Sequence, residues 1–71
     1  MTKRFKILVK RIPGKSSREE ISPGETFENL LKKLGINRET VVVRRNGRLV
    51  AESEKISPGD KVEIVSIISG G

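Results

Sequence analysis

The chain has 71 residues, with 15 Lys and Arg against 9 Asp and Glu, which gives a formal net charge of +6. It contains no Cys and no His, which excludes disulfides, the usual soft metal sites and catalysis by a cysteine or a histidine. Its length suits one small domain, and without a long apolar run we expect a single cytoplasmic domain with no membrane partner.

The first part of the chain predicts a β-hairpin. Residues 4–12 alternate between two faces, as a half-buried strand does. Pro13-Gly14-Lys15 has the composition of a turn, so a second strand over about 17–21 would return antiparallel to the first. The two faces of the first strand are expected to carry Phe5, Ile7 and Val9 on one side, and Lys6, Leu8 and Lys10 on the other.

The middle of the chain changes to a helical period. Thr26 can cap the start of a helix, and Gly35 is a natural stop after it. Ile36 is expected to fold back onto the core. The buried face of this helix is predicted to consist of Phe27, Leu30, Leu31 and Leu34.

The last third predicts a second hairpin and a final strand. A strand over 40–45 is followed by Asn46-Gly47, the pair that a two-residue type I′ turn prefers, and by a short return strand over 48–51. Residues 52–56 are ambiguous; a single helical turn is one interpretation, with Ile56 pointing inward. Residues 57–60 turn the chain into an apolar strand that begins near Lys61.

These elements indicate an α+β fold with a mixed sheet of four to five strands packed on one helix. The final strand is the most apolar, so we expect it in the centre, beside the first strand and parallel to it. Gly70 and Gly71 have no side chains, and residues 69–71 are therefore predicted to form a flexible tail of this single domain, 1–71.

The positive charge is concentrated near the start of the chain. Residues 1–18 hold seven basic side chains and no acid: Lys3, Arg4, Lys6, Lys10, Arg11, Lys15 and Arg18. Such a segment could attract nucleic acid or an acidic protein, or it could be a solvated surface of the kind found in heat-stable proteins. The only aromatic residues are Phe5 and Phe27, so the stacking platform of single-strand binders is missing.

Three stretches carry a resemblance to a known family: VVVRRNGRLV at 41–50, ISPGDKVEIV at 56–65, and the final Gly70-Gly71. In this order and spacing, the chain resembles the ubiquitin-like β-grasp sulfur carriers of the ThiS/MoaD family and their archaeal relatives that also act as protein modifiers. The resemblance covers nearly the whole chain and implies the β-grasp fold.

The resemblance also implies a function. In the family, an E1-like adenylating enzyme uses ATP to activate the terminal glycine, here Gly71, and a sulfur donor protein converts the product into a thiocarboxylate. The sulfur then goes to a thiazole, a pterin or a tRNA base, through partners such as a thiazole or molybdopterin synthase subunit. Alternatively, the activated glycine acylates a lysine of another protein. The chain itself would be no enzyme and would bind no cofactor, and Gly70 would allow passage through the partner's channel.

A carrier also needs a docking surface. With the helix on one side of the sheet, Leu8, Val42, Val65 and Ile67 could gather on the other side as a partner site, or they could be scattered or covered by loops. The rival interpretation is a nucleic-acid-binding β-grasp module that uses residues 3–18 and the arginines Arg44, Arg45 and Arg48. The basic charge departs from the neutral or acidic carrier that the family leads us to expect, and it leaves the identity of the partner open.

Overall fold

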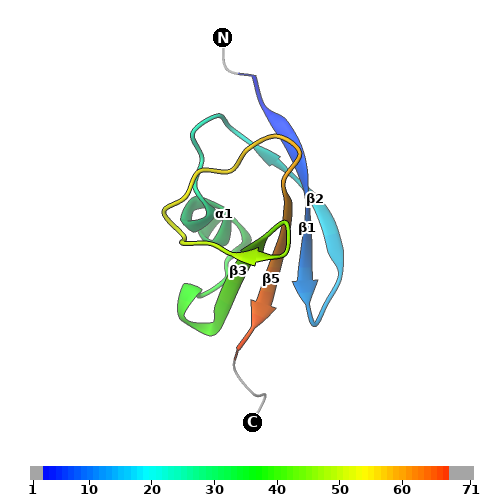
Figure 1. Cartoon of the computed structure of the whole chain (residues 1–71), viewed down its shortest axis with the longest axis vertical. Coiled ribbons are helices and arrows are strands. Elements are labelled where there is room, and N and C mark those ends of the chain that lie inside the picture. Colours follow the sequence, from blue (N-terminus) through cyan, green and yellow to red (C-terminus); the bar gives the residue numbers. More distant parts are fainter. Residues whose placement is uncertain (1–2, 68–71) are drawn as a thin grey trace.

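A mixed sheet with one helix against it makes up the fold (Figure 1). The structure, a computed structural model, describes residues 3–67. Within that range the elements follow the predicted order closely. They are β1 (Phe5–Ile12), β2 (Ser16–Ile21), α1 (Phe27–Leu34), the 3-10 helix η1 (Arg38–Thr40), β3 (Val41–Arg45), β4 (Arg48–Leu49) and β5 (Lys61–Ser66).

The last strand lies in the middle of the sheet. Over the described residues the strand order is β2-β1-β5-β3-β4, with β5 parallel to β1 and antiparallel to β3. Its inward side chains, Val62 and Ile64, are 1% and 2% exposed. The predicted central position of the final strand is therefore confirmed. In this position the most apolar strand has a neighbouring strand on each side and lies away from the edges of the sheet.

The helix begins and ends where the sequence indicated. The Thr26 hydroxyl accepts a hydrogen bond from the Asn29 amide (3.3 Å), while the Asn29 side-chain oxygen accepts one from the Thr26 amide (3.2 Å). Gly35 ends the helix in the left-handed region, with φ 72°. This reciprocal cap satisfies backbone donors that the first turn leaves unpaired. Within residues 3–67 no helix has the length and apolarity needed to cross a bilayer.

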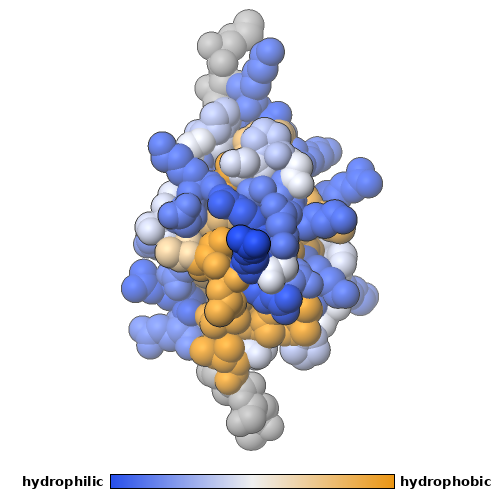
Figure 2. All heavy atoms as spheres, viewed as in Figure 1, coloured by the Kyte–Doolittle hydropathy of each residue, from blue (hydrophilic) through white to orange (hydrophobic). Residues whose placement is uncertain are grey.

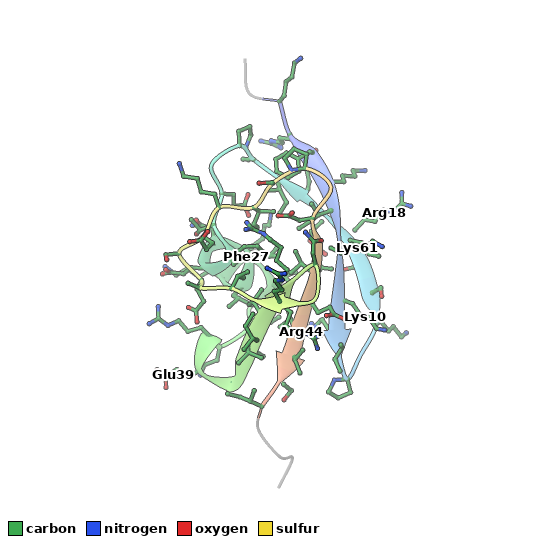
Figure 3. All side chains as sticks on the ribbon, in the orientation of Figure 1. Lys10, Arg18, Phe27, Glu39, Arg44 and Lys61 are labelled. Atoms are coloured by element: carbon green, nitrogen blue, oxygen red, sulfur yellow. The ribbon has the colours of Figure 1, made fainter. Side chains whose placement is uncertain are left out.

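The core lies between α1 and the sheet, and Figure 3 shows Phe27 there. Ile56 is 4% exposed, as predicted, although it belongs to no helix or strand. Leu34 and Ile36 are partly buried at the edge of the core. The buried apolar residues are Ile7, Val9, Ile21, Phe27, Leu30, Leu31, Val43, Ile56, Val62 and Ile64.

The segment 52–56 is not the helical turn that one interpretation of the sequence suggested. Its backbone lies across the start of α1 and supplies acceptors there: the Phe27 amide donates to the Glu54 carbonyl (3.2 Å) and the Glu28 amide to the Glu52 carbonyl (2.9 Å). Lys55 forms an isolated bridge with Thr26. The conformation is set by these distant partners, because the first amides of a helix need acceptors from outside it.

The second hairpin is confirmed, but its return strand is shorter than predicted. Asn46 and Gly47 have φ of 50° and 85°, as a type I′ turn requires. β4 ends at Leu49, and the Val50 amide donates to the Val43 carbonyl (3.0 Å) while its side chain packs against the core. The return strand thus ends two residues before the predicted residue 51, although the Val50 backbone still hydrogen-bonds to β3.

Candidate functional site

The predicted reactive residues, Gly70 and Gly71, lie outside the residues that the structure describes. What the structure does describe is the strand that leads to them. The pairing of β5 with β3 ends in the partners Val41 and Ser66, and the Ile67 amide donates to the Thr40 carbonyl (3.0 Å). The chain is therefore held in the centre of the fold up to Ile67.

The side of the sheet turned away from α1 carries the candidate docking residues, and we call it the open face. Strand side chains alternate between faces, and those next to the buried core residues on each strand point to the open face. Its members are Ser16, Arg18 and Glu20 on β2; Lys6, Leu8, Lys10 and Ile12 on β1; Val42 and Arg44 on β3; Leu49 on β4; and Lys61, Glu63, Val65 and the following Ile67 on β5.

Three of the four predicted docking residues come together at one end of the open face. Val65 is directly opposite Val42 on β3 and Ile12 on β1, and all three are half-buried. Ile67 follows in the same alternation and is 57% exposed. We call Ile12, Val42 and Val65 the apolar row. Figure 2 shows an apolar area that extends to the end of the described chain on the C-terminal side.

Leu8, the fourth predicted docking residue, lies apart from this row. It is 46% exposed and pairs with Lys61 of β5. The row of Lys10, Glu63 and Arg44 lies between Leu8 and the apolar row. Leu8 instead lines a shallow hollow of about 590 Å³ that these three charged residues and Lys61 also line.

Most of the cations on the open face have no ion-pair partner in the part of the chain that the structure describes. The Arg44 guanidinium Nε lies 3.4 Å from a Glu63 carboxylate oxygen. Within residues 3–67, no ion-pair partner is found for the other cations of the face. These are Lys6, Lys10, Arg18 and Lys61, which together with Arg44 we call the basic area. Figure 3 shows Lys10, Arg18 and Lys61 on the side of the sheet away from α1.

Arg45 lies on the opposite side of the sheet, where its side chain has partners within the fold. Its Nε lies 3.0 Å from the Asp60 carboxylate, and its guanidinium donates to the Lys55 carbonyl and stacks 5.1 Å from the centre of the Phe27 ring. Asp60, 9% exposed, also accepts from the Ser57 amide at 2.8 Å. Arg45 is therefore not available to the nucleic-acid surface of the rival interpretation, because this arginine holds β3 to the loop before β5.

The basic residues near the N-terminus are likewise divided. Lys6, Lys10 and Arg18 lie on the open face. Arg4 is paired with Glu20 at 3.4 Å. Arg11 follows Lys10 on β1 and therefore points to the other side of the sheet. The run of basic residues in the sequence therefore does not become one continuous patch.

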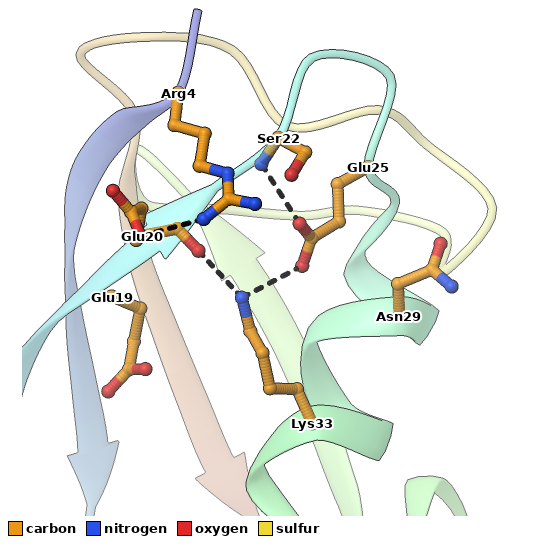
Figure 4. Close-up of a pocket in the computed structure, with 7 residues that line it drawn as sticks. All are labelled: Arg4, Glu19, Glu20, Ser22, Glu25, Asn29 and Lys33. Atoms are coloured by element: carbon orange, nitrogen blue, oxygen red, sulfur yellow. Dashed lines mark hydrogen bonds and ion pairs between the residues drawn. The ribbon is translucent and has the colours of Figure 1, made fainter. Parts of the chain in front are cut away.

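A second hollow, of about 560 Å³, lies between β2 and the start of α1 (Figure 4). Lys33 connects the two elements: its Nζ donates to the Glu20 carbonyl (2.6 Å) and lies 3.3 Å from the Glu25 carboxylate. Glu25 in turn accepts from the Ser22 amide (3.0 Å). These groups neutralise one another. We therefore interpret the contacts in this hollow as structural, because they join β2 to α1. Over residues 3–67 no group of acidic side chains that could hold a metal ion is found.

Two residues of the open face were missed as docking candidates. Ile12 joins Val65 only through the parallel register of β1 and β5, which no local pattern encodes. Leu49 is 70% exposed and lies opposite Arg44. A signal for Leu49 was present, because a two-residue turn at Asn46-Gly47 fixes the register of the hairpin.

Comparisons with known proteins agree with this geometry. The model of the ThiS family matches residues 8–71. The sulfur carrier protein TtuB of Thermus thermophilus is 33% identical over 64 residues, which cover 90% of this chain and 97% of TtuB. An uncharacterized protein of Archaeoglobus fulgidus is 38% identical over 48 residues, covering 68% of this chain and 70% of that protein.

Among the solved structures that resemble this chain are a ubiquitin and a protein designed on the basis of ubiquitin. A protein designed on the basis of ubiquitin has a TM-score of 0.73 and 26% identity, over 94% of this chain and 93% of its own. Caldiarchaeum subterraneum ubiquitin has a TM-score of 0.70 and 21% identity, over 97% and 100%. A Haloferax volcanii protein solved in solution has a TM-score of 0.74 and 18% identity, over 96% and 88%. The predicted α+β, ubiquitin-like β-grasp fold is therefore confirmed.

Proposed function

The chain belongs to the ThiS family, and on this basis we propose that it is a sulfur carrier protein activated at the carboxylate of Gly71. The observation that carries the proposal is the extent of the family match, which runs from Leu8 to Gly71 and so includes both the sheet and the glycine pair. The similarity to TtuB over nearly all of that carrier's length supports it.

The proposed chemistry needs a partner enzyme because a carboxylate is a poor electrophile. A Gly71 carboxylate oxygen attacks the α-phosphate of ATP on an E1-like enzyme, pyrophosphate leaves, and a mixed anhydride with AMP forms. Hydrosulfide released by a sulfur donor protein then attacks the carbonyl carbon, AMP leaves with the electron pair of its bond to that carbon, and a thiocarboxylate forms with loss of one proton. The chain supplies no catalytic group of its own and binds no cofactor; ATP is consumed by the partner in the cytoplasm.

The described part of the chain supports this role in two ways. The central strand β5 is paired on both sides, so it provides a firm base for whatever follows Ile67. The apolar row and Ile67 lie at the same end of the open face, where an enzyme that takes up Gly70 and Gly71 would touch them first. We therefore propose Val42, Val65 and Ile67 as docking residues next to the reactive terminus, with Leu8 in a separate part of the interface.

The sulfur would go on to a thiazole, to molybdopterin or to a tRNA base, through the synthase subunit or modifying enzyme of that pathway. Transfer of the activated glycine to a lysine of another protein is the alternative outcome of the same activation. Both outcomes need the adenylate at Gly71, which is therefore the step to test.

The test is ATP–pyrophosphate exchange catalysed by the E1-like enzyme of the source organism. We expect exchange with the intact chain, and none when Gly71 is deleted or when one residue is added after it. Thermal unfolding of both variants should match that of the intact chain, since neither change touches the core. Undiminished exchange by the extended chain would contradict the proposal.

A further inference from the structure

The distribution of acids around the fold is uneven. The alternation of β1, β2, β3 and β5 places the acids Glu20 and Glu63 on the open face. The same face carries the five cations of the basic area. Glu20 is already paired with Arg4 and Glu63 with Arg44. The remaining acids lie elsewhere and are Glu19, Glu25, Glu28, Glu39, Glu52, Glu54 and Asp60. The open face therefore has a positive excess that the described part of the chain does not neutralise.

Apolar side chains distinguish this surface from a binding site for nucleic acid. Leu8 is nearly half exposed and lies on β1 between Lys6 and Lys10, with Arg18 and Lys61 directly opposite it on the flanking strands. The apolar row continues the surface toward the end of β5. A phosphate backbone offers nothing for these apolar groups to contact, and both aromatic residues, Phe5 and Phe27, pack with the core instead.

An apolar centre with charges around it is the usual composition of a protein interface. The hollow of about 590 Å³ beside Leu8 gives room for an apolar side chain of a partner. Lys10, Arg44 and Lys61 line the same hollow, and carboxylates of a partner could reach them without displacing an existing pair at Lys10 or Lys61.

We propose that the open face docks onto an acidic surface of the E1-like activating enzyme. In this interface Lys10, Arg18 and Lys61 face carboxylates of the enzyme, while Leu8 and the apolar row contact apolar side chains. The inference rests on the proposed function and adds the chemistry of the partner to it. Because exposed charges act mainly on the rate of encounter, binding should weaken as salt is raised.

The experiment compares two triple variants in the pyrophosphate-exchange assay. Lys10→Gln/Arg18→Gln/Lys61→Gln removes charge from the open face. Its matched control removes charge elsewhere: Lys3→Gln/Lys15→Gln/Lys55→Gln. Each variant loses three positive charges, so both fall from +6 to +3 and differ only in location. We expect the first to raise the KM for the carrier by about tenfold with kcat unchanged, and to flatten its salt dependence. The control should behave like the intact chain.

Equal KM values for the two triple variants, with the intact chain active, would overturn this inference and leave the proposed function standing. No exchange with the intact chain would instead contradict the proposed function. Binding of bulk tRNA to the three proteins is measured in parallel. If the open-face variant lost only tRNA binding, the surface would be a nucleic-acid site and the inference would be wrong. Thermal unfolding confirms that both variants are folded.

Discussion

The two sides of the sheet use the same kinds of residues for different purposes. On the helix side, two ion pairs join separate parts of the fold: Lys33 with Glu25 at 3.3 Å, and Arg45 with Asp60 at 3.0 Å. On the open face, Lys10 has no ion-pair partner among residues 3–67. The apolar side chains that fill the core are buried on the first side, whereas those on the second side are half-buried or exposed. One side holds the fold together, and the other is available to a partner.

The contrast reaches the level of neighbouring residues. Arg44 and Arg45 follow each other on β3 but point to opposite sides, because strand side chains alternate. Arg45 is surrounded by an acid, a carbonyl and an aromatic ring, whereas Arg44 has one partly exposed pair with Glu63. Composition alone would count them as two equal basic residues. Substitutions in matched pairs can therefore separate stability from recognition.

The largest effect is expected for a pair of leucines. Leu30 is 1% exposed and Leu8 is 46% exposed. Leu30→Ala should lower the free energy of unfolding by about 3 kcal/mol, because it leaves a cavity in the core. Leu8→Ala should lower it by less than about 1 kcal/mol, since nearly half of this residue already meets water. Urea denaturation measures both, and an equal loss would show that Leu8 is part of the core.

The arginine pair comes next. Arg45→Ala should lower the free energy of unfolding by about 2 kcal/mol, because Asp60 would keep a buried charge without its partner. Arg44→Ala should lower it by less than about 1 kcal/mol, because water reaches this ion pair and weakens it. Urea denaturation again provides the measurement. If Arg44→Ala proved the more damaging change, the division between the two sides would be wrong.

The helix cap is expected to contribute less. Thr26→Ala removes the acceptor for the Asn29 amide and should lower the free energy of unfolding by about 1 kcal/mol. Thr26→Ser keeps the hydroxyl and serves as the control. An unchanged midpoint of thermal unfolding for Thr26→Ala would indicate that the contacts with residues 52–56 hold the start of α1 without the cap.

A pair of lysines should give the smallest change in stability. Lys33→Gln weakens the contacts between β2 and α1. It should lower the free energy of unfolding by less than about 1 kcal/mol, because Lys33 is partly exposed. Lys10→Gln should leave the midpoint of thermal unfolding unchanged and raise the KM for the activating enzyme. The reverse pattern, with a stability loss only at Lys10, would argue that Lys10 has a partner within the fold.

Much of the fold could be predicted because its signals are local. Thr26, the apolar spacing after it and Gly35 define α1, and Asn46-Gly47 defines the second hairpin. The central position of β5 followed from its apolar composition. The conformation of 52–56 could not be predicted, because carbonyls of that segment are held by amides at the start of α1, which lies more than twenty residues earlier in the chain.

The arrangement of the candidate docking residues was only partly predictable. Alternation placed Leu8, Val42 and Val65 on the correct face, but their relative positions depend on the register between β1, β5 and β3. That register places Val65 beside Ile12 and not beside Leu8, and a shift of one residue would have reversed the faces. The roles of Gly70 and Gly71 came from the family resemblance and remain a proposal.

The most direct test is the mass of the tryptic peptide Val62–Gly71, taken from the protein isolated from its own cells. Trypsin can release it because Lys61 precedes it and no basic residue follows. We predict exchange of one oxygen for sulfur at Gly71, the mark of a thiocarboxylate. A branched peptide joining Gly71 to a foreign lysine would identify a protein modifier instead of a sulfur carrier. A plain carboxylate under every growth condition would contradict activation at Gly71.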